Sequence, residues 1–554
     1  MAEDEPKAAD VSGAESLLLE MLGVDFVAYV LNAALSSVTE RLSQGTTLPE
    51  RQEQALESLV SFLGTLPLDD PGTFSFHVAP LGMYDAQAGT SLAAALRREL
   101  GGDLLSVRGD DPATVALLTI ARDVYPLMLL PRDSAFFMMS MSLGGPIFTH
   151  PEHSSFQAAV MADPVLAKMF YDSSSEIRAG RLYTSTGRGG TTQLSLFAEL
   201  LIENAWHSIV HTGVKPTQDL VAEQLAVALH IARKALLPEP LAITARAGIT
   251  GVRLPDKAEI RFPGGRLRPT TEIDRLYAPP ALEGVVRGTS DRGVVEMAYS
   301  GDLILEVEVP YSVVVGDVAP DAMYPWPGGA ASAEMLQTRL ETVTLALLLS
   351  WDDSPRPTTF ATWRAFADPL IRGSTHSWSD PGRLPTFVPI QLTADEASRW
   401  QQWIERIDEH RVPSVAIAIR RTLQATAERT DPTDGLVDAV IAWENLVGSG
   451  GGESTLRVSA ALAWLLADHP GERNAIRKRI SGIYDMRSKV VHGAQALDAR
   501  KAYDAQQEAV DIAISALRAL FGRRPDLLTE CKNSGERSLR LLLDDGADTT
   551  SDTE

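Results

Sequence analysis

The segment RISGIYDMRSKVVHG, residues 479–493, is the most informative stretch of this 554-residue chain. It ends with Arg487 and His492 separated by four residues and followed by Gly493. An imidazole, with a pKa of about 6.5, can accept and return a proton near neutral pH. A guanidinium presents a planar fork of donors to phosphate oxygens and stabilises negative charge on them. The pair can therefore serve phosphate chemistry without a metal ion.

The apolar spacing predicts a helix over Glu472–His492 that ends with this motif. Five residues at about 100° each place Arg487 and His492 roughly 140° apart on an ideal helix. A helix end at His492 would let the imidazole turn toward Arg487, because glycine commonly follows a helix C-terminus. Spacing alone leaves a second interpretation open, in which the histidine favours the helix dipole and the arginine is solvated.

The flanking sequence predicts further helices, joined by short links that glycine or proline marks. Apolar residues recur with a helical period over Thr393–Ile407, Pro413–Ala427, Asp434–Leu446, Glu453–Leu466, Glu472–His492 and Lys501–Leu520. Five or six helices in succession are typical of an antiparallel bundle.

Three ordered segments of this region carry a family resemblance. They are DGLVDAVIAWENLVG at 434–448, LRVSAALAWLL at 456–466 and the segment at 479–493. Together they resemble the Apea-like HEPN family, whose members show an acidic helix with an A-x-E core and a closing Y-x-x-R-S-x-V-V-H-G. Ala442 and Glu444 match the first feature, and Tyr484 to Gly493 match the second.

The resemblance implies an Apea-like HEPN domain over 393–525 that pairs with a second copy of itself. It implies a metal-independent endoribonuclease of bacterial anti-phage defence or toxin type, with Arg487 and His492 as catalytic residues and no cofactor. The supporting residues would be Ser488, Tyr484, Glu444 and Asp438. Ser488 stands where many active members carry Asn, Asp or His. The alternative is a non-catalytic dimerisation or nucleotide-binding protein.

The charge distribution favours RNA as the partner of this region only. The net charge of −23 argues against a general nucleic-acid coat or a membrane-surface protein. Residues 472–501, however, contain eight basic and three acidic residues, a local charge of +5. The candidates for RNA binding are Arg477, Lys478, Arg479 and Lys489. A solvated helix face is the alternative for the first three.

The remaining sequence predicts a mainly α, multi-domain protein. An acidic leader over 1–13 and an acidic tail over 540–554 are expected to be disordered. Residues 14–240 are expected to form a mostly helical sensor or regulatory region, 241–318 a small β-rich module and 319–390 a linker with a helix. Within the module, VVEMAY and LILEVEV flank a Ser-Gly-Asp turn at 300–302 and predict a hairpin.

Two clusters of histidines are further candidates for functional sites. Glu203, His207 and His211 are spaced to share one helix face and could bind a metal ion, although buried structural histidines are the commoner case. His150 and His153 form a second H-x-x-H pair. The remaining patterns are interpreted as structural: Gly187–Gly190 as a flexible loop, and Trp400 with Trp403 as core.

The sequence also predicts the compartment and the partners. One cysteine, Cys531, excludes an intramolecular disulfide and fits a reducing cytosol. Neither an export signal nor a membrane span is expected, so a cytoplasmic location follows. The expected partners are RNA, a second copy bound through the apolar helices 456–466 and 510–520, and a phage-derived trigger at the N-terminal region. No metal site is expected.

Overall fold

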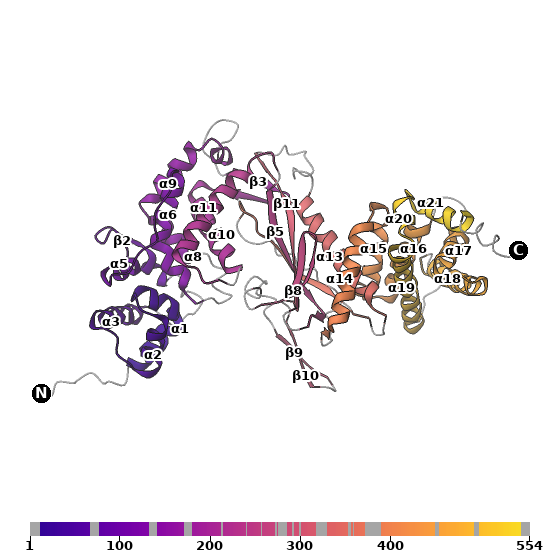
Figure 1. Ribbon diagram of the computed structural model, residues 1–554, viewed down its shortest axis with the longest axis horizontal. Coiled ribbons are helices and arrows are strands. Elements are labelled where there is room, and N and C mark those ends of the chain that lie inside the picture. Colours follow the sequence, from indigo (N-terminus) through magenta and orange to yellow (C-terminus); the bar gives the residue numbers. More distant parts are fainter. Residues whose placement is uncertain are drawn as a thin grey trace.

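The computed structural model describes most of the chain: residues 11–66, 77–131, 141–170, 180–211, 214–239, 241–255, 258–271, 274, 285–290, 293–298, 301–316, 330–352, 356–357, 359–371, 389–448, 454–491 and 498–544. These residues are mostly helical with several small sheets, as the sequence predicts. Figure 1 shows helices at the N-terminal side, a sheet in the middle and a second helical group at the C-terminal side. The acidic leader lies outside the described residues up to residue 10.

The N-terminal region is mainly helical. Its helices are α1 (Val11–Val30), α2 (Leu35–Gln44), α3 (Glu50–Gly64), α5 (Leu92–Glu99), α6 (Pro112–Val124), α8 (Met141–Thr149), α9 (Glu152–Ala162), α10 (Phe197–His211) and α11 (Gln218–Ala235). Its short strands are β1 (Tyr84–Asp85), β2 (Thr90–Ser91), β3 (Gly180–Thr184) and β4 (Arg188–Thr192). The prediction of a flexible loop at Gly187–Gly190 is wrong, because Gly187, at φ +80°, supplies the tight turn between β3 and β4.

A five-stranded antiparallel sheet lies at the centre of the chain. Its strand order is β13 (Phe360–Phe366), β5 (Leu241–Thr250), β11 (Leu303–Tyr311), β8 (Gly265–Pro269) and β7 (Ile260–Phe262). The edge strand β13 comes from the segment predicted as a linker with a helix. That helix is α13 (Ala331–Ser350), which packs against β11 and β5.

Smaller strand pairs surround this sheet. The predicted hairpin is wrong, because β10 (Gly293–Ala298) pairs with the preceding strand β9 (Val285–Ser290), whereas β11 pairs with β5 and β8. β12 (Val313–Val315) joins β3, so pairing crosses the predicted border at residue 240. The last pair is β6 (Val252–Arg253) with β14 (Ile390–Gln391).

The C-terminal helical group follows closely the helices that the sequence predicts. It contains α14 (Ala394–His410), α15 (Ala416–Leu423), the π-helical turn η8 (Gln424–Glu428), α16 (Pro432–Val447), α17 (Ser454–Leu466), α18 (Pro470–Val491) and α19 (Ala499–Gly522). Side chains at several N-termini explain the boundaries: Thr393 and Glu396 form a capping box, and Asp431 and Asp498 accept backbone N–H groups. The core of this group holds Trp400, whose indole N–H donates to the Val343 carbonyl of α13, 2.9 Å away.

The group continues past residue 525, where the predicted domain ends. α20 (Asp526–Thr529), α21 (Ser534–Leu539) and the π-helical turn η9 (Arg540–Asp544) follow. The predicted disordered tail is therefore helical over 540–544, and 545–554 lies outside the described residues. The fully buried Arg537 of α21 donates to the carbonyls of Leu446 and Asn445 at the C-terminus of α16, over 2.7 and 3.0 Å.

Candidate functional site

α18 presents Arg487 on its packed side. Ile480, Ile483 and Tyr484 of the same helix are buried. At about 100° per residue, Arg487 continues this stripe one turn later, and it is partly buried. The guanidinium is therefore held against the bundle rather than extended into solvent.

A hydrogen bond joins two of the predicted supporting residues next to this arginine. The Tyr484 hydroxyl donates to the Glu444 carboxylate of α16. Tyr484 is only 6 % exposed, so it packs in the core and also makes a polar contact between the two helices. Because residues three apart are neighbours on a helix, this contact lies beside Arg487.

The Nε atom of Arg487 is buried and has no hydrogen-bond partner within the described part of the chain. Leaving a buried donor unsatisfied costs about 1–3 kcal/mol, so such groups are rare in folded proteins. The groups that satisfy a guanidinium best are carboxylates and phosphates. Arg487 Nε is one of five buried side-chain polar atoms in the described residues that lack a hydrogen-bond partner, and the others include atoms of Trp351, Thr422 and Gln506.

Asp438 makes a different contact. This buried carboxylate accepts from Arg421 Nη1 at 2.7 Å and from Arg429 Nε at 2.5 Å. Arg421 belongs to α15, and Arg429 directly follows η8. Glu444 lies six positions after Asp438, which places the two side chains about 120° apart around α16, so the two carboxylates face different neighbours. Asp438 holds α15 and η8 to α16 and does not join the Tyr484 contact.

The four residues predicted to bind RNA do not share one face of α18. Lys478 and Lys489 are exposed and lie about 160–180° from Arg487 around the helix. Arg479 is exposed and pairs with Glu508 of α19 at 2.7 Å. Arg477 is partly buried and contacts Asn474 at 3.4 Å. The two lysines therefore form a separate basic surface from the one at Arg487.

The other half of the motif lies outside the described residues. α18 ends at Val491, and His492 and Gly493 follow among residues 492–497, which the structure does not describe. Ser488 is partly buried on α18. The predicted approach of His492 to Arg487 therefore stays a prediction.

The predicted dimer surface is wrong for one of its two helices. Within α19, Val510, Leu517 and Leu520 are at most 1 % exposed, because this helix packs inside the bundle. In α17, Val458 and Leu462 are also buried, whereas Leu456 is 51 % exposed. Large apolar side chains are exposed elsewhere, at Val491 (50 %) and Tyr503 (45 %), on the two sides of the α18–α19 connection.

The paired histidines of the N-terminal region have structural partners. His150 Nε2 lies 2.9 Å from Asp123 Oδ2, and its Nδ1 accepts the Glu152 N–H. His150 Nε2 therefore donates to Asp123. Burial opposes ionisation of Asp123, but hydrogen bonds from His150 and Thr90 keep its pKa below the usual range. His153 Nε2 contacts the Ser195 carbonyl instead, so the two histidines do not converge.

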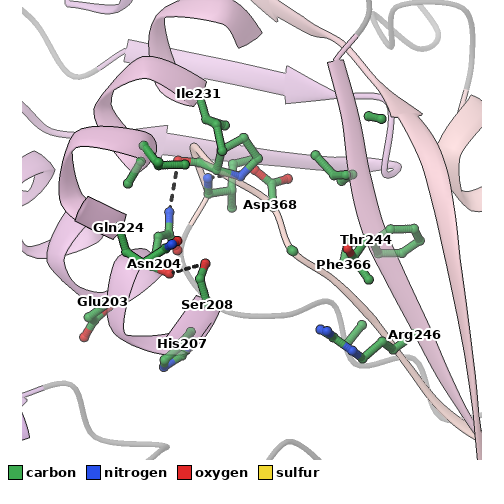
Figure 2. A pocket seen from close by; sticks show the side chains of 18 residues that line it. Glu203, Asn204, His207, Ser208, Gln224, Ile231, Thr244, Arg246, Phe366 and Asp368 are labelled. Atoms are coloured by element: carbon green, nitrogen blue, oxygen red, sulfur yellow. Dashed lines mark hydrogen bonds between the residues drawn. The ribbon is translucent and has the colours of Figure 1, made fainter. Parts of the chain in front are cut away.

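The second histidine set lies beside a cavity that the sequence did not predict. Glu203 and His207 of α10 line a cavity of about 260 Å³ between α10 and α11 on one side and β5 and β13 on the other (Figure 2). The side chain of His211 lies outside the described residues. Among the side chains that the structure describes, no group of three His, Cys, Asp or Glu is placed to hold a metal ion.

Comparisons with known proteins identify no relative of this chain. No family model, no curated protein and no solved structure matches this chain. In the described part of the chain, no helix is both long and apolar enough to cross a membrane.

Proposed function

We propose that the C-terminal helical group is a HEPN-type, metal-independent endoribonuclease, regulated by the N-terminal region in bacterial anti-phage defence or a toxin system. One observation carries the proposal. The buried, unsatisfied Nε of Arg487 lies one turn from the end of α18, five residues before His492. The motif, the resemblance of the three segments and this donor all support the proposal that this arginine binds a phosphate.

The proposed reaction needs only the two motif side chains. The ribose 2′-hydroxyl attacks the adjacent phosphorus, and the P–O5′ bond breaks. His492 takes the 2′-hydroxyl proton as general base or protonates the departing 5′-oxygen as general acid, and water carries the other proton. Arg487 binds the phosphate and the negative charge that grows on it. The products carry a 2′,3′-cyclic phosphate and a 5′-hydroxyl.

The contact between Tyr484 and Glu444 has a positioning function in this proposal. It fixes the last turns of α18 against α16, and so sets the direction of the Arg487 side chain. Lys478 and Lys489 lie on the opposite side of α18 from Arg487, and we assign them to binding RNA away from the cleaved bond.

A composite site from two chains is part of the proposal. Val491 and Tyr503 expose apolar surface beside the motif, which a second copy would cover. Such pairing would bring two motifs together and double the local positive charge. Light scattering should then give at least a dimer at micromolar concentration. A strict monomer that still cleaves RNA would contradict the composite site.

The decisive experiment is RNA cleavage by the full chain. His492→Ala should lower the rate by about 10²–10⁴-fold without unfolding the protein, because a general acid or base is removed. Arg487→Lys should also be damaging, since a point charge does not reproduce bidentate contact. Lys489→Ala, on the opposite side of the same helix, is the matched control and should change binding more than the rate.

Three further measurements define the chemistry. Cleavage should survive EDTA, should leave a 2′,3′-cyclic phosphate and should not occur on single-stranded DNA, which lacks the nucleophile. RNA binding without cleavage would favour the non-catalytic nucleotide-binding alternative, for which an anion at Arg487 is equally suitable. Normal cleavage by His492→Ala would overturn the mechanism.

A further inference from the structure

The cavity beside α10 has one cationic wall. Arg246 extends from β5 toward the helix that carries His207 and Ser208 (Figure 2). Its Nε donates to Glu306 Oε2 at 2.9 Å, and the described residues offer this arginine no other hydrogen-bond partner. The guanidinium is thus fixed at one nitrogen while its terminal nitrogens reach the cavity side.

The charge at this wall is positive because Glu306 is shared. Glu306 lies directly across from Arg246 on one neighbouring strand and from Arg266 on the other. It accepts from Arg266 at 2.7 Å and from Arg268 at 3.3 Å, and Arg268 also pairs with Asp274 at 2.6 Å. Glu259 also pairs with Arg266 at 3.5 Å and with Arg261 at 2.6 Å. Four arginines therefore meet three carboxylates in this cluster, and one positive charge remains.

The carboxylates that line the cavity do not cancel this charge. Asp368 is 5 % exposed, and its carboxyl accepts from the Tyr311 hydroxyl at 2.7 Å and from the backbone N–H groups of Leu370 and Ile371. It also accepts from the hydroxyls of Thr184 and Thr186 at 3.2 and 3.5 Å, so its hydrogen bonds run to its own loop, to β11 and to the end of β3. Burial raises the pKa of Asp368. Glu203 points away from Arg246 in Figure 2.

The rest of the lining suits the body of an organic molecule. Apolar side chains come from both sides, with Val227 and Ile231 on α11 and Ile243 and Phe366 on the strands. Polar groups in the lining are those of Thr244 on the strand side with Arg246, and of Ser208 and Gln224 on the helical side. A volume of about 260 Å³ is slightly below the range of drug-sized pockets, which fits a molecule with one or two rings.

We propose that this cavity binds a small organic anion, a carboxylate or a phosphate monoester on an apolar ring, with Arg246 holding the anionic group. The bidentate fork of arginine matches both groups. Nothing in this proposal depends on RNA cleavage by the C-terminal helices, so the two can fail separately.

The test is calorimetric titration of the full chain with three probes of similar size: benzoate, phenyl phosphate and the neutral benzamide. At least one anion should bind at about millimolar concentration or below. Benzamide should bind about tenfold more weakly or not at all, because it makes no charge-assisted hydrogen bond. The relative affinities of benzoate and phenyl phosphate distinguish a carboxylate site from a phosphate site.

Two variants and a control assign the binding. Arg246→Gln should weaken anion binding about tenfold or more. Arg266→Gln removes an equal charge from the same Glu306 but lies outside the cavity lining, and should change the affinity less than about twofold. Val227→Trp, at a position 39 % exposed, should fill the cavity and abolish binding without loss of folding.

Four results would overturn the proposal. They are no binding of either anion, equal binding of benzamide, unchanged affinity in Arg246→Gln or Val227→Trp, and an equal loss in Arg246→Gln and Arg266→Gln.

Discussion

Arg487 and Arg537 lie in the same helical group but differ in how far the protein satisfies their hydrogen-bond donors. Arg537 is completely buried, and its guanidinium donates to two carbonyls of α16 and to the Ser414 hydroxyl. Arg487 is only partly buried, yet its Nε is buried with no partner in the described chain. An arginine that serves the fold has its donors satisfied by the fold. The arginine that the fold leaves unsatisfied is the better candidate for a ligand.

The largest expected effect is a loss of RNA cleavage when Arg487 is replaced. Arg487→Met should lower RNA cleavage by about 10²-fold or more, because it removes the charge that stabilises the transition state. Its free energy of unfolding should change by less than about 1 kcal/mol, since an unsatisfied donor is replaced by an apolar chain. Cleavage assays and urea unfolding check both values. A large loss of stability would show that Arg487 is structural.

The reverse pattern is expected at the other arginine. Arg537→Met should lower the free energy of unfolding by about 2–4 kcal/mol, because it leaves buried carbonyls of α16 unsatisfied. Urea unfolding at neutral pH measures this loss. Arg479→Met, which removes an exposed ion pair with Glu508, is the control and should cost less than about 1 kcal/mol. Equal losses at the two positions would contradict the distinction.

A smaller effect tests the contact beside Arg487. Tyr484→Phe keeps the packed ring and removes the hydroxyl that donates to Glu444. We expect a loss of about 1 kcal/mol in stability and about tenfold in cleavage rate, because α18 is then less firmly positioned. Glu444→Gln keeps an acceptor for the tyrosine hydroxyl and should therefore have a weaker effect on both the stability and the cleavage rate. An unchanged rate in Tyr484→Phe would leave this tyrosine with a packing function only.

The smallest effect concerns pH and the arginines of the central sheet. Burial opposes ionisation of Glu306, but Arg246, Arg266 and Arg268 outweigh it and lower its pKa from 4.5 to about 2. A lowered pKa contributes stability above about pH 4.5, and this contribution is lost as pH falls toward about 2. The wild type should therefore exceed Glu306→Gln in free energy of unfolding by a margin that is about 1 kcal/mol smaller at pH 3.5 than at pH 7.

Urea unfolding at both pH values measures that margin. Glu308→Gln, exposed and two residues farther along β11, is the control and should leave the margin unchanged between the two pH values. A difference in free energy of unfolding between the wild type and Glu306→Gln that grows on acidification would contradict the lowered pKa of Glu306.

The sequence predicted the helices of the C-terminal group well because each has its own apolar period and local caps. It also grouped Tyr484 with Glu444 as supporting residues, and the structure joins these two side chains by a hydrogen bond. It missed the arginines that bind Asp438, because Arg421 and Arg429 belong to other segments and carry no motif. Side-chain partners of this kind are decided by tertiary packing.

The strands and the cavity show the same limit. β10 and β11 alternate similarly and are separated by a turn signal, so adjacency favoured a hairpin that the structure does not form. The choice of partner depends on the whole sheet. The cavity could not be predicted, because Asn204, Arg246 and Phe366 are far apart in the chain and meet only when α10 packs beside β5 and β13.

The buried position of Arg537 also has a kinetic consequence. Its partner Leu446 precedes it by 91 residues, so the end of α16 is synthesised long before the group that completes it. Closing a loop of that length has an entropic cost and slows the pairing. We therefore expect the carbonyls at the end of α16 to stay hydrated during translation until α21 has been made and docks against them.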